Sequence, residues 1–379
     1  MGSAGVPKYP LHLKTDVSLD SWKKDALHVL QHVKPDWDSC LVCFKEFNAG
    51  ITNKVVGMYL PERKDDMVLL RIYGKGTESF IDRDAEKDNI TLLHEAGCAP
   101  SYYASFKNGL AYAYVPGLTT DVHTVRSPEV MPMICDMLAK IHCISLPYNG
   151  MPQSCLWKRF NVLLDLYPDS FKEPERQEIF LREVAPKGKL VAEMEDLQSK
   201  LGSSTSPIVF CHNDLLLGNI IYSKKSSSVT FIDYEYGGLN YQAFDIGNHF
   251  CEYAGVEDVD YSRYPDRDLQ LKWLRLYLMA FKNYSGQDEK FAEEEVESLY
   301  VQVNQFSLAA NLFWGIWAII QAHHSLLDFD FLRWLLVEAL IFVRKKCYFF
   351  QYGILRMNEY FQRKEMFLKL QPKDPITYS

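Results

Sequence analysis

The residues best suited to catalysis follow two apolar runs in the middle of the chain. An apolar run at 208–211 precedes Asp214, Asn219 comes five positions later, and a second apolar run ends at Asp233. A carboxylate at the end of a buried strand is suited to accept a proton from an attacking hydroxyl group. A carboxamide and a second carboxylate are hard oxygen ligands of the kind that Mg²⁺ prefers. This order predicts magnesium-dependent phosphoryl transfer, with Asp214 as the base and Asn219 and Asp233 as metal ligands.

Three neighbouring polar residues are predicted to support this site. His212 braces the loop by hydrogen bonding. Glu235 lies two positions after Asp233, and on a strand it would share the same face, within reach of a second metal ion or its water shell. Asp245 has two interpretations, a contact with a substrate ammonium group or a brace that accepts backbone N–H groups of the catalytic loop. We favour the brace, which is the role of an aspartate at a comparable place in protein kinases.

The same stretch resembles a known family. Protein kinases carry His-Arg-Asp-x4-Asn, and this chain carries His-Asn-Asp-x4-Asn at 212–219. The longer pattern at 232–250 resembles the signature of the choline/ethanolamine kinases and matches it at every fixed position. Further matches run from about residue 30 to about residue 333 and again after 352. The stretch that begins with Glu252-Tyr-Ala-Gly-Val is closer to the ethanolamine kinases than to the choline kinases.

The resemblance implies a fold, an activity and a set of partners. The fold would be α+β and bilobal, like that of protein kinases. The activity would be transfer of phosphate from ATP to ethanolamine with Mg²⁺, giving phosphoethanolamine in the first step of phosphatidylethanolamine synthesis by the CDP-ethanolamine pathway. Choline kinase, an aminoglycoside-type phosphotransferase, and a catalytically impaired variant that binds nucleotide or regulates a partner remain open. A homodimer or heterodimer is also open.

The resemblance assigns two groups of residues to the nucleotide. The segment 48–54 resembles the phosphate-facing loop of the family, and a plain hairpin turn is the alternative. The residues of this loop assigned to phosphate are Asn48, Gly50, Thr52 and Asn53. Arg71 takes the place of the strand lysine of protein kinases, with Glu86 on the following helix as its partner. The planar fork of an arginine suits phosphate oxygens.

The resemblance also indicates a pocket for the amine. Glu252 is placed where the family has a carboxylate close to the amine. Trp314 and Trp317 are three positions apart and share one helix face, where aromatic rings would hold a cation. Ordinary core packing is the alternative for this pair.

Residues 334–351 are an apparent insertion relative to the family, as in an isoform with an extension. The family places a pocket tyrosine 17 positions after the second tryptophan, and this position is Trp334 in the present chain. The natural equivalent, Tyr352, is displaced. Either Trp334 substitutes for it, or the chain loops out and returns Tyr352 to its place. The apolar part of the insertion, 334–343, is too short to cross a bilayer.

Composition limits the class of protein. The chain has 379 residues and is 47% hydrophobic, which allows a core in each of two lobes. The net charge of −8 argues against nucleic acid as the main partner. Nine scattered cysteines, an odd number without zinc-finger spacing, indicate free thiols in a reducing cytoplasm.

The pattern of apolar residues changes near residue 116. We expect an N-lobe at 1–116 and a C-lobe at 117–379, with the nucleotide in the cleft. The N-lobe has helical patterns at 18–32 and 83–96 and strand patterns at 38–47, 51–60, 67–73, 101–106 and 110–116. The C-lobe has helical patterns at 128–145, 174–201, 266–284, 289–304 and 304–325, with the two catalytic strands among them.

Overall fold

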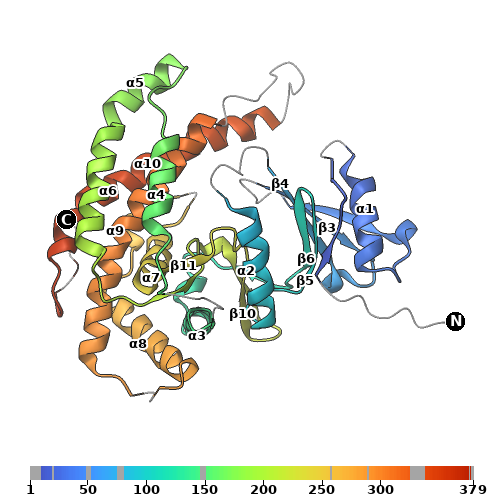
Figure 1. The fold of residues 1–379 in the computed structure, drawn as a ribbon, viewed down its shortest axis with the longest axis horizontal. Helices are drawn as coiled ribbons and strands as arrows, with labels where there is room; N and C mark the ends of the chain where they lie inside the picture. Colours follow the sequence, from blue (N-terminus) through green and yellow to red (C-terminus); the bar gives the residue numbers. More distant parts are fainter. Residues whose placement is uncertain are drawn as a thin grey trace. The chain divides into compact units, whose positions relative to one another are not determined.

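The chain divides into two compact units, which are described separately and can be traced in Figure 1. In this computed structural model, one unit comprises Met1–Thr119 with Asn219–Gly237, and the other comprises Thr120–Gly218 with Gly238–Ser379. The expected boundary was residue 116, and the structure adds the segment at 219–237 to the first unit. The residues described are 10–18, 21–47, 53–74, 81–145, 151–256, 258–287, 290–324, 338–374 and 376, with the backbone alone for 324 and 338–348.

A six-stranded sheet forms the centre of the first unit in the part of the chain that is described, in the order β1-β5-β6-β4-β3-β2. The strands are β1 (Leu11–His12), β2 (Cys43–Phe47), β3 (Asn53–Tyr59), β4 (Val68–Tyr73), β5 (Tyr102–Phe106) and β6 (Gly109–Ala113). All neighbouring pairs are antiparallel except β1 with β5. The sequence pattern does not predict β1, because two residues carry no periodicity.

The two faces of this sheet carry different helices. Helix α1 (Trp22–Val33) packs its apolar residues with Leu70 and Ile72 of β4 in one core cluster. Helix α2 (Arg83–Glu95) contributes Ile90 to a second cluster with Leu110 of β6. Successive side chains of a strand point to opposite faces. The alternation in β4 therefore places Arg71 on the face opposite α1, where it meets Glu86 of α2.

A separate small sheet completes the first unit. Strands β9 (Ile220–Ser223) and β10 (Ser228–Phe231) form an antiparallel hairpin, and β7 (Leu118–Thr119) pairs with β9. Phe231 pairs with Ile220, and the Ile232 N–H donates to the Asn219 carbonyl at 3.0 Å. This register places Asn219 and Asp233 at the same end of the hairpin.

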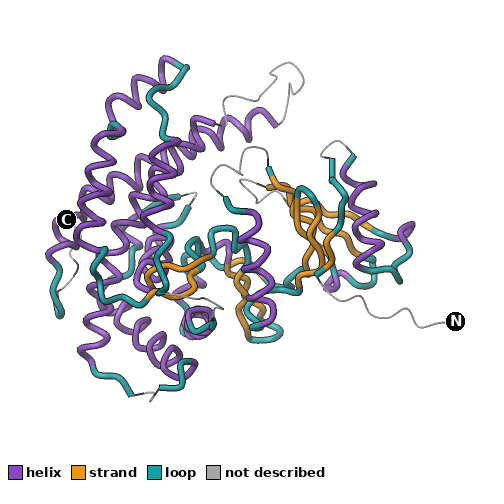
Figure 2. The backbone as a smooth tube through the Cα atoms, in the orientation of Figure 1, coloured by secondary structure: helices purple, strands orange, loops and turns teal. Residues whose placement is uncertain are grey.

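The second unit is mainly helical (Figure 2). Its helices are α3 (Val130–His142), α4 (Leu156–Leu166), α5 (Pro174–Glu183), α6 (Lys187–Leu201), α7 (Gln242–Cys251), α8 (Arg267–Tyr284), α9 (Glu293–His324) and α10 (Glu338–Lys369). Strands β8 (Ile208–Cys211) and β11 (Gly238–Tyr241) form an antiparallel pair.

Several helix boundaries differ from the sequence expectation. The helix expected at 174–201 is broken into α5 and α6 before Pro186, because proline cannot continue the hydrogen bonds of a helix and disfavours helical backbone at the preceding residue. The two helices expected at 289–304 and 304–325 are one continuous helix, α9. The sequence pattern did not predict α4, and the backbone at 338–351 is already part of α10.

Helix α9 is the apolar centre of the second unit. Among the described residues, it is the one helix long and apolar enough to cross a membrane by length and composition, but 94% of its most apolar window is buried inside the protein. A helix in the core of a globular protein can also be this long and apolar. The burial of α9 therefore agrees with packing in the core.

Two glycines allow α9 and α10 to approach closely. A methyl group built on Gly353 would lie 2.9 Å from Ile319 Cδ1 and 3.1 Å from the Gly315 carbonyl oxygen. One built on Gly315 would lie 2.9 Å from Met357 Cγ. A side chain at either position would have to push the helices apart.

We expect Gly353→Ala to lower the free energy of unfolding by about 1–3 kcal/mol, since the added methyl group overpacks this crossing. Gly188→Ala is the matched control, because Gly188 also lies in a helix but nothing approaches its added methyl group within 4 Å. The control should be neutral or stabilising by about 0.5–1 kcal/mol. Urea unfolding of both variants tests this, and equal midpoints would contradict it.

Candidate active site

The loop that carries Asp214 follows β8 directly and is enclosed by the second unit. His212 is fully buried, and its Nδ1 faces the Asp214 N–H at 3.3 Å. Asn213 has φ 66°, in the left-handed region that asparagine tolerates better than most residues. The Asn240 side chain donates to Asn213 Oδ1 at 2.7 Å. The loop therefore has a defined turn immediately before Asp214, whose own side chain is half-buried.

Asp245 of α7 holds this turn through two backbone hydrogen bonds. Its Oδ2 accepts the His212 N–H at 2.8 Å, and its Oδ1 accepts the Asn213 N–H at 2.7 Å. The carboxylate is fully buried. These contacts favour the bracing interpretation of Asp245 over a direct contact with the substrate ammonium.

Two residues from distant helices extend the brace. His142 of α3 pairs through Nε2 with Asp245 Oδ2 at 3.0 Å, and its Nδ1 lies 2.6 Å from the Tyr277 hydroxyl of α8. Burial acts to raise the pKa of the Asp245 carboxyl, but the His142 hydrogen bond and the backbone donors outweigh it, so this pKa lies below its ordinary value. Sequence reasoning missed His142 and Tyr277, because no spacing in the chain connects them with the loop.

The brace also brings a cysteine close to these groups. Ligand atoms of His142, Cys211 and Asp245 lie within 4.8 Å of one another. Both oxygens of Asp245 and both nitrogens of His142 already have hydrogen-bond partners. Burial raises the pKa of the Cys211 thiol well above its ordinary value, so the thiolate that a metal requires is disfavoured. We interpret the cluster as a hydrogen-bond network.

Two further residues of α7 hold the other side of the loop. His249 Nδ1 lies 3.0 Å from the Leu215 carbonyl oxygen, and Asn248 Nδ2 donates to the Asn213 carbonyl at 3.4 Å. Burial lowers the pKa of His249 to about 4, so the ring is neutral near pH 7 and its Nδ1–H is the donor. Helix α7 thus fixes the backbone on both sides of Asp214.

The predicted metal ligands belong to the first unit. Asp233 follows β10 with φ 67° and therefore leaves the strand. Its Oδ1 is buried and forms no hydrogen bond within the described part of the chain, although Arg71 Nη1 lies 2.8 Å away. An anionic oxygen in this state, next to the Asn219 end of the hairpin, fits the donor chemistry of Mg²⁺.

Arg71 lies at the centre of a cluster of three carboxylates. Its Nη1 is 3.0 Å from Glu86 and 2.8 Å from Asp233, and its Nη2 pairs with Glu235. Arg83 adds a second guanidinium, 2.9 Å from Glu86 and 3.1 Å from Glu235. When all three carboxylates are ionised, two positive and three negative groups leave one excess negative charge, which a cation would balance. Arg83 was missed, although its three-residue spacing from Glu86 on a helix was a readable signal.

Glu235 takes a different position from the one expected. The prediction placed it on a strand together with Asp233, but the backbone after Phe231 is irregular. Glu235 is buried and bonds Arg71, Arg83 and the Asn53 side chain, the last at 3.2 Å. Its carboxylate therefore anchors the arginines in this structure, and a role toward a second metal ion would require these contacts to change.

The pKa of Asp233 responds to the same charges. Burial raises the pKa of its carboxyl above the ordinary value, and Arg71 acts in the opposite direction. A divalent cation would lower this pKa, since it favours the charged form.

The aromatic pair and Glu252 lie in the second unit. Trp314 and Trp317 are both buried, with ring centroids 5.4 Å apart in an edge-to-face arrangement. Glu252 is buried and pairs with Arg356 of α10 at 3.1 Å. Burial raises the pKa of the Glu252 carboxyl, although Arg356 lowers it. Arg356 was not predicted, yet it lies four positions after Tyr352 on the same helix, and its guanidinium is 5.4 Å from the centre of the Tyr352 ring.

Some predicted site residues lie outside the described residues. They are Asn48, Gly50, Thr52 and Trp334. Tyr352 is described and buried on α10. The chain therefore has Tyr352 in a packed helix at the end of the apparent insertion.

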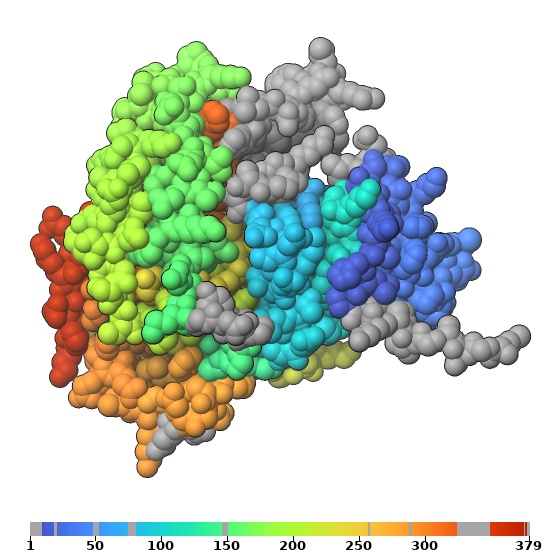
Figure 3. Space-filling view, in the orientation of Figure 1, coloured from blue at the N-terminus to red at the C-terminus, as the bar shows by residue number. Residues whose placement is uncertain are grey.

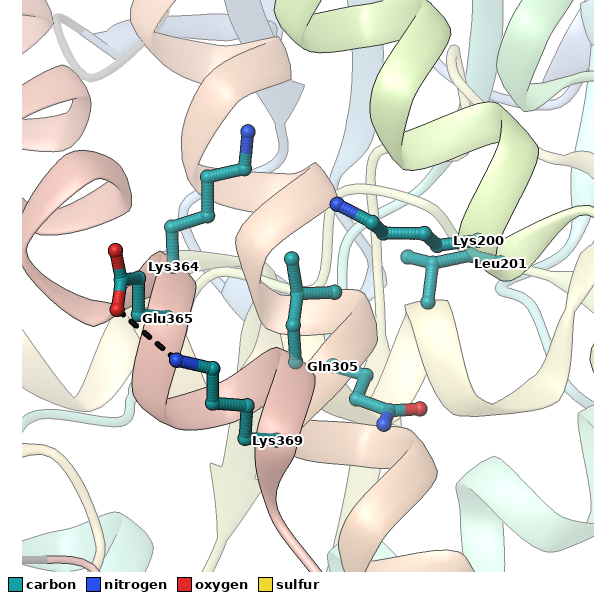
Figure 4. A pocket seen from close by; sticks show the side chains of 7 residues that line it. Lys200, Leu201, Gln305, Lys364, Glu365 and Lys369 are labelled. Carbon is teal, nitrogen blue, oxygen red and sulfur yellow. Dashed lines mark hydrogen bonds and ion pairs between the residues drawn. The ribbon is translucent and has the colours of Figure 1, made fainter.

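A cavity of about 600 Å³ lies elsewhere in the second unit (Figure 4). It is found where the C-terminal part of the chain borders α6, and these two segments are neighbours in Figure 3. Its lining is Lys200, Leu201, Gln305, Lys364, Glu365, Leu368 and Lys369. Each lysine already has a carboxylate partner, Asp196 for Lys200 and Lys364 and Glu365 for Lys369. The cavity thus offers little excess positive charge to a phosphate group.

Comparisons with known proteins show the family of the chain. The family model described as choline/ethanolamine kinase matches residues 44–340. Ethanolamine kinase 1 of Mus musculus is 43% identical over 96% of this chain and 95% of its own length. The Homo sapiens ethanolamine kinase 1 is also 43% identical, over 96% of this chain and 76% of its own length.

Solved structures show the same fold. An ethanolamine kinase of Plasmodium vivax superposes with a TM-score of 0.72 at 26% identity, covering 90% of this chain and 89% of that one. A choline kinase of Cryptosporidium parvum has a TM-score of 0.69 at 20% identity, covering 90% and 95%. The expected α+β fold of the protein-kinase type, with a strand-rich and a helical unit, is confirmed.

Removing the charge of Arg71 should destabilise the first unit. We expect Arg71→Gln to lower the free energy of unfolding by about 3–5 kcal/mol, because it leaves three carboxylates together without their main counter-charge. Lys87→Gln breaks an exposed pair with Asp84 and should cost less than about 1 kcal/mol. Urea denaturation measures both, and a similar small cost for the two variants would show that the cluster adds no stability.

His249 should make stability depend on pH. Its pKa is about 4 in the folded chain, below the ordinary value, so between about pH 6.5 and 4 the unfolded state binds the extra proton. Stability from this residue is complete above that window and is lost as the pH falls through it, by up to about 1.4 kcal/mol per pH unit. His249→Gln should flatten the dependence in urea titrations, whereas His32→Gln at an exposed position should not. An unchanged slope in His249→Gln would exclude this origin.

Proposed function

The chain belongs to the choline/ethanolamine kinase family, and from this premise we propose that it transfers the γ-phosphoryl group of ATP to the hydroxyl group of ethanolamine. The products are phosphoethanolamine and ADP, and phosphoethanolamine feeds phospholipid synthesis. The observation that carries the proposal is the complete set of Asp214, Asn219 and Asp233 in a chain whose curated relatives are named ethanolamine kinases.

The proposed reaction is a direct transfer between two bound substrates. The Asp214 carboxylate accepts the hydroxyl proton as the ethanolamine oxygen bonds to the γ-phosphorus. The bond from that phosphorus to the bridging oxygen breaks, and ADP leaves. Bracing by Asp245 supports this role, because a base held in one position needs little reorganisation during the reaction.

Other residues are proposed to bind the two substrates. Asn219 and Asp233 would hold Mg²⁺, which supplies neutralisation of phosphate charge when bound. Arg71 is proposed to meet phosphate oxygens, with Glu86 and Glu235 fixing its orientation. In the amine pocket, Glu252 supplies negative charge, and the indole faces of Trp314 and Trp317 meet the ammonium group.

We further propose that the enzyme acts in the cytoplasm. The eight cysteines in the described part of the chain are free thiols. This state fits a reducing compartment.

The activity is tested by ADP release from MgATP with ethanolamine and with choline. We expect faster release with ethanolamine, because a primary ammonium uses hydrogen-bond acceptors in addition to aromatic faces. Asp214→Asn should lower kcat by about 10²–10⁴-fold without a change in ATP affinity. Faster release with choline would favour the choline kinase alternative. Amine-independent ATP binding without turnover would favour the impaired variant, and full turnover of Asp214→Asn would exclude Asp214 as the base.

A further inference from the structure

Near its end, the apparent insertion contains an aromatic residue that contacts Trp317 of the predicted amine pocket. Phe349 packs edge-on against Trp317, with ring centroids 5.8 Å apart and an angle of 82° between the rings. The family match ends at residue 340, so Phe349 lies beyond it. Trp317 also forms an edge-to-face contact with Trp314. Three rings from two helices therefore form one continuous row.

The orientation of Trp317 depends on these ring contacts. Its Nε1 is buried and forms no hydrogen bond within the described part of the chain. A buried indole normally finds a partner for this N–H, and the partner then fixes the ring. The edge-to-face contacts with Trp314 and Phe349 therefore contribute to holding the angle of Trp317. Trp314 comes from the same helix, so Phe349 supplies the restraint from α10.

The geometry of α10 places Phe349 beside the residues proposed to bind the amine. Phe349, Tyr352, Gly353 and Arg356 are spaced by three and four residues and share one face of the helix. Gly353 on this face touches α9 at Gly315, between the two tryptophans in sequence. Arg356 on the same face pairs with Glu252. The residues proposed to surround the amine are thus joined to Phe349 through one helix crossing.

We propose that Phe349 is a positioning residue for the amine pocket, which holds the Trp317 ring at the angle that receives the substrate ammonium group. This inference rests on the proposed function and assigns a role to the apparent insertion. The apparent insertion would then complete the pocket wall rather than disrupt it.

The neighbouring phenylalanine provides a matched control. Phe350 is as buried as Phe349, with exposures of 6% and 8%, and lies on the same turn of α10. Its ring packs against Phe171, at a centroid distance of 5.2 Å. Phe349→Ala and Phe350→Ala therefore remove the same group from the same helix, and they differ in which ring cluster loses a member.

The test compares the two variants in the full-length protein with MgATP. We expect Phe349→Ala to raise the KM for ethanolamine about 2- to 10-fold, the effect of losing one edge-to-face pair, while the KM for ATP stays unchanged. Phe349→Leu keeps most of the volume without the ring and should fall between the wild type and Phe349→Ala. Phe350→Ala should lower the melting temperature to a similar extent and leave the KM for ethanolamine unchanged.

A binding measurement separates this inference from the proposed activity. Titration with ethanolamine or choline, followed by tryptophan fluorescence, reports amine binding without turnover. A wild-type chain that binds amine but does not release ADP would contradict the proposed activity, and the weaker binding expected for Phe349→Ala would still support the positioning role. The role is overturned if the two alanine variants weaken amine binding equally, if Phe349→Ala raises both KM values equally, or if the wild type binds no amine.

Discussion

The conformation of the loop that carries Asp214 depends on the hydrogen bonds that the buried Asp245 carboxylate accepts. An ionised carboxylate in a protein interior is costly unless every oxygen has a hydrogen-bond partner. Here the partners are the N–H groups of His212 and Asn213 and the ring of His142. The cost of burying this charge is offset only when the loop has the conformation that supplies these hydrogen bonds. The buried carboxylate therefore also fixes the backbone before Asp214. The catalytic loop and the core of the second unit are therefore stabilised together.

The first unit also buries a charged group, but this charge is positive. Arg71 is buried, and its charge is satisfied by Glu86, Asp233 and Glu235. The cluster supplies carboxylate oxygens that could bind a cation, and its ion pairs hold the guanidinium as a fixed positive group. Such preorganised charges are effective in phosphoryl transfer because little rearrangement is needed when the phosphate charge shifts.

The crossing of α9 and α10 joins helix packing to the residues proposed to bind the amine. Gly315 and Gly353 remove the side chains that would separate the two helices. The close approach brings Phe349 against Trp317 and allows Arg356 to reach Glu252. A segment that appears as an interruption in the sequence is thus helical where it is described, from Glu338 onward, and Phe349 and Phe350 near its end belong to the packed core.

The sequence by itself determined the local features of this protein. Period-two and helical patterns predicted most strands and helices, and the spacing from Asp214 to Asn219 and Asp233 indicated the chemistry, because these signals lie within short stretches of chain. It did not determine the pairing of Asp245 with His142 of α3 and of His142 with Tyr277 of α8, the pairing of Glu235 with Arg83, or that of Glu252 with Arg356. Only the tertiary structure decided these contacts, because burial removes the competing water and makes each charged group depend on whichever distant element the fold brings beside it.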